Sequence, residues 1–258
     1  MMKMGYKVFR TGIDALDKML GGGIIEDGIL LIVYNTGSYG WALGVEVFKK
    51  FIERGWYGVI TSYSLPYRLL MKYSTAVRFG FHTFGTEGRL AVIDVFGSVN
   101  GVQPREPYVY SLGYVDGSTF LPKILTLYKR LILGKPKRIG LTVTMDGFVE
   151  IFGEDAGMRI LKKNIALKES YPRSNVDEVL NVFLINRDRV SSRFLSWLSQ
   201  YAEHIVEFRP TERPGVENLV VLKSLLPEFE PSTGIFKFKK GRVGIRLLSE
   251  VENRGQNV

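Results

Sequence analysis

A glycine-bearing turn stands where a phosphate-binding loop would be expected. An apolar run over residues 28–34 leads into the eight residues NTGSYGWA, and a helical pattern over residues 43–54 follows. Strand, turn and helix in this order suit the pattern Gly-x-x-x-x-Gly-Lys-Ser/Thr. The chain keeps the second glycine and replaces the first glycine, the lysine and the hydroxyl residue. The loop consists of Asn35, Thr36, Gly37, Ser38, Tyr39, Gly40, Trp41 and Ala42.

Two of the replaced positions carry the chemistry of such a loop. Phosphoryl transfer depends on neutralising charge, with the loop lysine at the phosphates and the loop hydroxyl on magnesium. Trp41 has an uncharged indole that only donates, and Ala42 has no polar side-chain atom. Backbone N–H groups at the helix start can still hold an anion, but the bulk of Tyr39 and Trp41 argues against a triphosphate. We interpret the loop as a vestigial phosphate site, in which Trp41 serves either packing or partner contact.

The composition leaves few other chemistries open. The 258 residues contain no cysteine and two histidines, His82 and His204, which excludes disulfides, thiolate catalysis and Cys-type metal sites. We expect no metal centre and no cofactor. The net charge of +9 admits an anionic partner such as nucleic acid, although a lysine-rich surface of thermophile type gives the same charge. Without a membrane-length apolar run or a signal-peptide pattern, we expect a soluble, cytoplasmic protein.

Apolar strands and amphipathic helices alternate along the chain, and these elements must position the loop. We expect one domain over residues 1–258 with a core from about 11 to 248, and an α/β fold whose mostly parallel sheet carries helices on both faces. The later short strands predict an antiparallel addition at the C-terminal end. Strands are predicted at residues 29–34, 57–63, 89–96, 137–145, 178–185, 204–208, 218–222, 235–238 and 243–247, and helices at residues 43–54, 66–79, 118–133, 155–165 and 192–201.

The longest connection between predicted elements covers residues 97–117 and contains three tyrosines, Tyr108, Tyr110 and Tyr114. One interpretation is a hairpin with its own small apolar cluster. The other is a recognition loop, because tyrosine offers a large contact area at low entropic cost.

The segment before the loop carries a family resemblance. Residues 11–24 read TGIDALDKMLGGGI, and this resembles the Thr-Gly-Ile, Leu-Asp and Leu-Gly-Gly-Gly phrase of the KaiC, RadA and RadB branch of the RecA superfamily. Near the other end, residues 232–238 read STGIFKF, which resembles the family's Ser-Pro-Gly-Ile-x-x-Phe phrase. The resemblance covers most of the chain and implies a RecA-type core. It points to the divergent KaiC-like proteins of hyperthermophilic archaea.

The resemblance also implies catalytic groups that this chain lacks. The family places one or two carboxylates just after the second strand, where this chain has Tyr63 and Ser64. A KaiC-like enzyme presents Lys-x-Arg to a neighbouring subunit, and here Lys223 remains while Leu225 replaces the arginine. Since losing even one strong charge-stabilising donor lowers a rate by roughly 10² to 10³, we expect no meaningful ATP hydrolysis.

One catalytic element matches the family. Asp146 follows the strand at residues 137–145, and the phrase DGFVE at residues 146–150 is similar to the family's Asp-Ser-Leu-x-Glu wording. The resemblance therefore makes Asp146 a remnant of the acid that orients magnesium. An acid at a strand end is also a common helix cap or turn residue, and Asp94 is a second such acid.

Three functions remain open. The first is a non-catalytic module that forms homo-oligomers or adds a protein or peptide segment to a sheet edge, as the RadA-like resemblance implies. The second, less favoured, is a RadB-like DNA-binding accessory protein of recombination or repair, and the third is a weak nucleotide-binding regulator. Residues 236–242 are predicted to alternate, with Phe236 and Phe238 on one side of a strand and Lys237 and Lys239 on the other.

Overall fold

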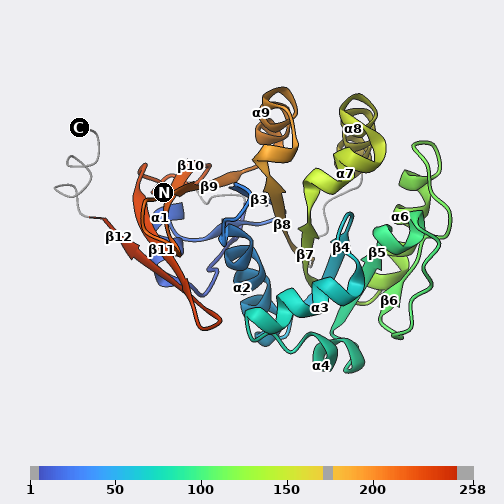
Figure 1. Ribbon diagram of the computed structural model, residues 1–258. Helices are drawn as coiled ribbons and strands as arrows, with labels where there is room; N and C mark the ends of the chain where they lie inside the picture. The colour runs from blue at the N-terminus through green and yellow to red at the C-terminus, as the bar shows by residue number, and fades with distance from the viewer. Residues whose placement is uncertain (1–5, 171–176, 249–258) are drawn as a thin grey trace.

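A ten-stranded sheet organises the part of the chain that the computed structural model describes, residues 6–170 and 177–248 (Figure 1). The strand order is β12-β11-β10-β9-β3-β8-β7-β4-β5-β6. From β9 to β6 all neighbours are parallel, whereas β10, β11 and β12 join antiparallel. The strands are β3 (Ile29–Tyr34), β4 (Tyr57–Ser62), β5 (Leu90–Asp94), β6 (Val109–Tyr110), β7 (Lys137–Val143), β8 (Glu178–Asn186), β9 (His204–Pro210), β10 (Val216–Ser224), β11 (Thr233–Lys239) and β12 (Arg242–Leu247).

Helices cover both faces of the sheet, as Figure 1 shows. Side chains of α1 to α4 pack into one core cluster, and side chains of α5 to α9 pack into a second cluster on the opposite face. The helices are α1 (Asp14–Leu20), α2 (Gly40–Glu53), α3 (Tyr67–Ala76), α4 (Phe81–Thr86), α5 (Val95–Val99), α6 (Phe120–Ile132), α7 (Met145–Phe152), α8 (Glu154–Ser170) and α9 (Ser192–Tyr201). The predicted α/β fold, with antiparallel strands at the C-terminal end, is confirmed.

The central strand β3 explains why the loop is held firmly. Its neighbours are β8 and β9, so both of its edges are paired. Leu30 and Ile32 enter one core cluster while Leu31 and Val33 enter the other, as the period of two requires. A strand buried on both faces needs a continuous apolar run, which is the pattern visible in the sequence.

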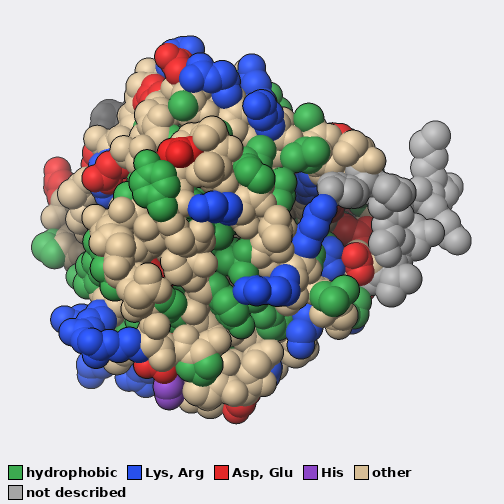
Figure 2. All heavy atoms as spheres, turned by 90° about the vertical axis from the view of Figure 1, so that its right-hand side faces the viewer, with side chains coloured by type: hydrophobic (Ala, Val, Ile, Leu, Met, Phe, Trp, Pro, Cys, Tyr) green, Lys and Arg blue, Asp and Glu red, His purple; other side chains and the backbone are tan. Residues whose placement is uncertain are grey.

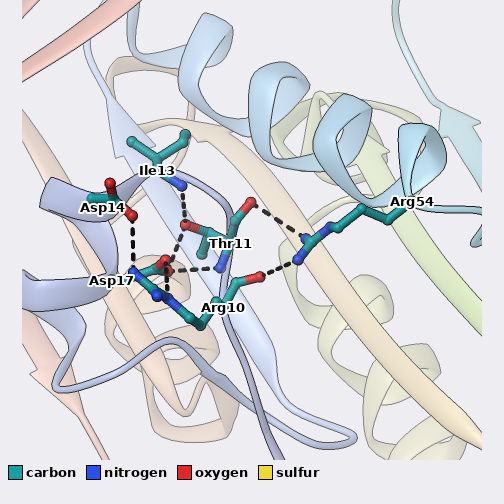
Figure 3. Close-up of polar contacts among 6 residues, drawn as sticks. All are labelled: Arg10, Thr11, Ile13, Asp14, Asp17 and Arg54. Carbon is teal, nitrogen blue, oxygen red and sulfur yellow. Dashed lines mark hydrogen bonds and ion pairs between the residues drawn. The ribbon is translucent and has the colours of Figure 1, made fainter.

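The segment that carries the family resemblance is fixed by a polar network (Figure 3). Asp17 of α1 is buried, and its Oδ1 accepts hydrogen bonds from the Thr11 N–H at 2.6 Å and the Thr11 hydroxyl at 2.7 Å. The Thr11 hydroxyl accepts in turn from the Ile13 N–H at 3.1 Å. Arg54, just after α2, donates to the carbonyls of Arg10 and Thr11 at 2.8 and 3.4 Å. The resembling residues therefore anchor α1 to the helix that follows the loop.

A short antiparallel pair, β1 (Val8–Phe9) with β2 (Ile24–Ile25), brackets this network. It was not predicted, and neither was α1. Each of these elements has seven residues or fewer, so hydrophobic periodicity has little length in which to show itself.

Several predicted boundaries were wrong. The helix predicted at residues 66–79 ends at Ala76, because Arg78 takes a positive φ of 54° and a separate helix, α4, follows. The strand predicted at residues 137–145 ends at Val143, and Met145 opens α7. The helix predicted at residues 155–165 is longer and runs over Glu154–Ser170.

The hairpin interpretation of residues 97–117 was also wrong. This connection begins within α5 and then forms β6, which lies parallel to β5 at the edge of the sheet. A parallel neighbour cannot close a two-strand hairpin, since the chain must first cross back along the sheet.

Candidate functional site

The loop lies between β3 and α2, at the carboxyl end of the parallel strands, where ligands bind in open α/β sheets. Its two glycines are required by geometry. Gly37 has a φ of +84°, which other residues rarely adopt. A Cβ on Gly40 would lie 2.7 Å from Phe208 Cδ2 and 2.8 Å from the Tyr34 Cβ. The two glycines therefore allow the tight path from β3 into α2.

Two carboxylates of the chain, Asp188 and Glu217, accept hydrogen bonds from groups of the loop. The Thr36 N–H donates to Asp188 Oδ2 at 2.7 Å, and the Asn35 amide donates to Asp188 Oδ1 at 2.8 Å. The Tyr39 N–H donates to Glu217 Oε2 at 3.0 Å. Each carboxylate takes a place that a phosphate oxygen would need, since anions bind such loops through backbone N–H groups.

Other loop donors are used within the loop. The Ser38 N–H donates to the Asn35 carbonyl at 3.0 Å, and the Gly40 N–H donates to the Ser38 hydroxyl at 2.9 Å. The Ala42 N–H donates to the Tyr39 carbonyl at 2.9 Å. The backbone donors of Thr36, Ser38, Tyr39, Gly40 and Ala42 all have acceptors inside the chain.

The charge beside the loop also opposes an anion. The pKa of the Asp188 carboxyl lies below its ordinary value, chiefly because the Thr36 N–H donates to it, so Asp188 stays ionised near neutral pH. Glu217 is buried. A phosphate group near Thr36 would therefore meet the negative charge of Asp188.

Trp41 packs within an aromatic cluster that we define as Tyr39, Trp41, Tyr73 and Phe238. The Trp41 ring lies 4.7 Å from that of Tyr73 in α3 and 5.9 Å from that of Phe238 in β11, edge to face in both cases. Tyr39 contacts Phe238 at 5.1 Å. Trp41 thus ties α2 to α3 and β11, which favours the packing interpretation, while Tyr39 is 42% exposed.

Asp146 lies in the first turn of α7 and is engaged by its own chain. Its Oδ1 accepts from the Asn186 N–H at 3.2 Å, and its Oδ2 forms an ion pair with Arg189 Nη1 at 2.9 Å. Arg189 also pairs with Glu150. Burial raises the pKa of Asp146 above its ordinary value, while the Asn186 N–H and Arg189 oppose this shift. A magnesium ion at this carboxylate would have to compete with the guanidinium.

Tyr63 and Ser64, which the sequence resemblance places at the catalytic-acid position, make packing and backbone contacts. The Tyr63 ring lies 5.2 Å from Phe148 and 6.0 Å from Phe120, inside the second core cluster. The Ser64 N–H donates to the Thr144 hydroxyl at 3.1 Å. No acid stands at this point of the sequence, and the aromatic contacts of Tyr63 direct it away from a catalytic role.

Lys223, which the sequence resemblance places at the trans-acting lysine position, contacts its own chain. Lys223 Nζ donates to the carbonyls of Ser199 and Gln200 at 3.2 and 3.4 Å, near the C-terminal end of α9. A cation there is favourable because the helix dipole places negative charge at that end. Leu225, at the arginine position, is 57% exposed.

The three tyrosines predicted to form a recognition loop have different surroundings. Tyr108 is buried, and its hydroxyl hydrogen-bonds with the Tyr67 hydroxyl at 2.6 Å. Tyr110 is half-buried in β6, with Arg130 5.9 Å above its ring, and Tyr114 is 74% exposed. Tyr108 is therefore withdrawn from any contact surface. A recognition role stays a prediction for the other two.

Sequence reasoning missed Asp188 and Glu217, which lie 152 and 178 residues along the chain from the loop residues Thr36 and Tyr39 that they contact. The strand register contains a signal for Asp188. Tyr34 pairs with Asn186 at the end of parallel β3 and β8, so a polar residue two positions later meets the loop. No comparable signal exists for Glu217, whose strand joins through the antiparallel addition.

Two further observations concern ligands and membranes. Over residues 6–170 and 177–248, no three side chains of His, Cys, Asp or Glu gather in a way that could hold a metal ion. Within the same ranges, no helix has the length and apolarity needed to cross a membrane.

Comparison with known proteins identifies the fold. No protein-family model and no curated protein matches the chain. Among solved structures, the uncharacterized protein PH0321 from Pyrococcus horikoshii, in complex with an unknown peptide, is similar with a TM-score of 0.77 and 20% identity, over 93% of this chain and 100% of that one. The KaiC-like protein PH0186 from Pyrococcus horikoshii OT3 gives 0.68 and 16% identity, over 95% and 100%.

The flagellar accessory protein FlaH from Methanocaldococcus jannaschii gives a TM-score of 0.65 at 16% identity, over 94% of this chain and 100% of that one. The chain therefore has the RecA-type fold of KaiC-like archaeal proteins, and the fold implied by the sequence resemblance is confirmed. At these identities the likeness concerns the fold alone.

Proposed function

We propose that this protein is a non-catalytic RecA/KaiC-like protein of the cytoplasm that acts by binding a protein or peptide segment or by self-association. One observation carries the proposal: acceptors of the chain itself engage the backbone N–H groups of Thr36, Ser38, Tyr39, Gly40 and Ala42, and two of these acceptors are the carboxylates of Asp188 and Glu217. A loop whose N–H groups at Thr36 and Tyr39 already meet carboxylates, with Trp41 at the lysine position and Ala42 at the hydroxyl position, is poorly equipped to hold a triphosphate.

The interaction half of the proposal draws support from PH0321, whose crystals contain an unknown peptide. RecA-type folds leave sheet edges to which an extended segment can add, and main-chain hydrogen bonds supply affinity there without nucleotide. Loss of ATP chemistry and retention of an interaction surface are therefore compatible.

A DNA-binding role has less support. Lys137 pairs with Glu178 and Arg138 with Asp177, each at 3.1 Å, so part of the basic charge is neutralised locally. On the face that Figure 2 shows, Lys and Arg side chains stand in separate groups with hydrophobic and uncharged surface between them. Binding to a phosphate backbone favours a continuous basic track.

A steady-state ATPase assay at high temperature tests the catalytic half. We expect no magnesium-dependent turnover above that of a blank without protein, because the groups that neutralise phosphate charge are replaced. Asp146→Asn serves as the control. Turnover that requires magnesium and disappears in this variant would overturn the proposal.

Light scattering over a range of concentrations tests the interaction half. We expect either a defined oligomer or a complex that retains a polypeptide through purification. A monomer at every concentration that carries no bound polypeptide would contradict the proposed role.

A further inference from the structure

The two edges of the sheet differ in what they offer to an added strand. At one end β6 has two residues, so it presents few backbone groups. At the opposite end β12 has six residues, and within the described ranges no strand pairs with its outer side (Figure 1). An added segment needs several outward N–H and C=O groups, and β12 supplies them.

The register identifies the outward groups. The Leu248 N–H donates to the Thr233 carbonyl at 3.1 Å. These two residues continue the β11–β12 register by one position, and they form a hydrogen-bonded pair. Such pairs alternate along an antiparallel ladder, so the even-numbered residues of β12 point their backbone groups at β11. Val243, Ile245 and Leu247 then direct their N–H and C=O groups outward.

The side chains of β12 give an added strand two different faces. Val243, Ile245 and Leu247 are half-buried against the first core cluster, so apolar residues of a further strand would extend that cover. The opposite face carries cations: Lys237, Lys239 and Arg242 are all exposed, and the paired strands β11 and β12 contain no acidic residue. The predicted alternation of Phe236, Lys237, Phe238 and Lys239 is confirmed, and it makes one face of this edge strongly positive.

We propose that the β12 edge takes up an extended segment of a partner polypeptide in which acidic and apolar residues alternate. This inference rests on the proposed interaction role and names its site and the chemistry of the partner. Alternation matches both faces at once, since opposite charges on the same face of a sheet attract and like charges repel. Arg242 lies on the strand next to the added segment, and Lys237 and Lys239 lie one strand further in, on β11. A segment with basic residues in the same positions meets repulsion from Lys237, Lys239 and Arg242.

Titration of the full chain with labelled synthetic peptides tests the proposal. One peptide alternates Glu and Val over six residues, the length of β12, and the other replaces Glu by Lys. We expect the acidic peptide to bind at least about tenfold more tightly at low salt, a difference that corresponds to 1.4 kcal/mol. Equal binding of the two peptides, or binding of neither, would overturn the proposal.

Two variants locate the binding site. The triple variant Lys237→Glu, Lys239→Glu, Arg242→Glu changes exposed side chains only and should reverse the preference to the basic peptide. Ile245→Pro removes the central outward donor, whose loss an edge strand tolerates, and should weaken binding about tenfold, whereas Ile245→Val retains the donor and the affinity.

The outcomes separate this inference from the proposed function. If the acidic peptide binds and neither variant changes its affinity, the interaction role stands and the β12 assignment falls. The ATPase assay decides the absence of catalysis independently of any peptide result.

Discussion

Acidification from neutral pH to about pH 4 is expected to lower the free energy of unfolding by about 3 kcal/mol through one side chain, the buried His204. Burial, together with the charge of Lys223, lowers the pKa of His204 from 6.5 to about 4. The difference between the unfolded and folded pKa values sets the loss of stability, because each unit of pKa corresponds to about 1.4 kcal/mol.

Hydrogen bonds fix the state of the His204 imidazole. The Ser224 hydroxyl donates its one proton to the Leu20 carbonyl at 2.7 Å, so the His204 Nδ1–H must donate to the Ser224 oxygen, 2.9 Å away. Nε2 accepts from the Ile25 N–H at 3.0 Å. A proton added at Nε2 would set two donors against each other, which is a further structural reason for the lowered pKa of His204.

The direction follows from proton binding. Between pH 6.5 and about 4 the unfolded chain takes up a proton on this histidine and the folded chain does not. Stability therefore falls as the pH falls through this window, and the contribution is intact above it.

Denaturant titrations at neutral pH and near pH 4 measure the effect. Carboxylates titrate in the same range, so the relevant quantity is the pH dependence of the parent minus that of His204→Gln, whose amide oxygen can still accept from the Ile25 N–H. His82→Gln, at the exposed histidine, is the matched control for replacing a histidine by glutamine. A parent and a His204→Gln variant that lose stability equally would refute the assignment.

Asp17→Ala is expected to destabilise the fold by about 3 kcal/mol, because it leaves the buried N–H and hydroxyl of Thr11 without their acceptor. The ion pair of Asp17 with Arg10, at 3.4 Å, is lost as well. Thermal or denaturant unfolding measures the change. Such a loss would show that the segment at residues 11–24 anchors α1 to α2, independently of any ligand at the loop.

Asp14→Ala is the control in the same helix. Asp14 pairs with the same Arg10 at 2.8 Å, but its side chain is 94% exposed, and exposed ion pairs contribute about 0–1 kcal/mol. A similar loss of stability in both variants would show that the network of Asp17 has no special weight.

Much of the fold was predictable from the sequence because long elements carry long patterns. The helix predicted at residues 192–201 coincides with α9, and the apolar run before the loop became the central strand β3. Some of the missed elements are short, such as β6. Others begin inside a segment that was predicted as a strand, such as α7. Their positions depend on tertiary contacts that periodicity does not encode.

For the candidate site, the sequence predicted only which residues of the loop pattern are absent. The sequence shows Trp41 and Ala42 at the lysine and hydroxyl positions of the loop pattern. The acceptors Asp188 and Glu217, which bind loop N–H groups, are distant in sequence. Asp188 reaches the loop through the β3–β8 register, and Glu217 through an antiparallel strand. The sequence shows which residues of the loop pattern are absent, whereas the acceptors of the loop N–H groups appear only in three dimensions.

Thermal unfolding with and without millimolar ATP and magnesium tests the central claim most directly, because a ligand that binds only the folded chain must stabilise it. At about a hundred times its dissociation constant, ATP would add about 2.7 kcal/mol. Because acceptors within the chain already bind the N–H groups of Thr36, Ser38, Tyr39, Gly40 and Ala42, we predict an unchanged melting temperature. A rise in melting temperature that saturates with ATP would contradict the account.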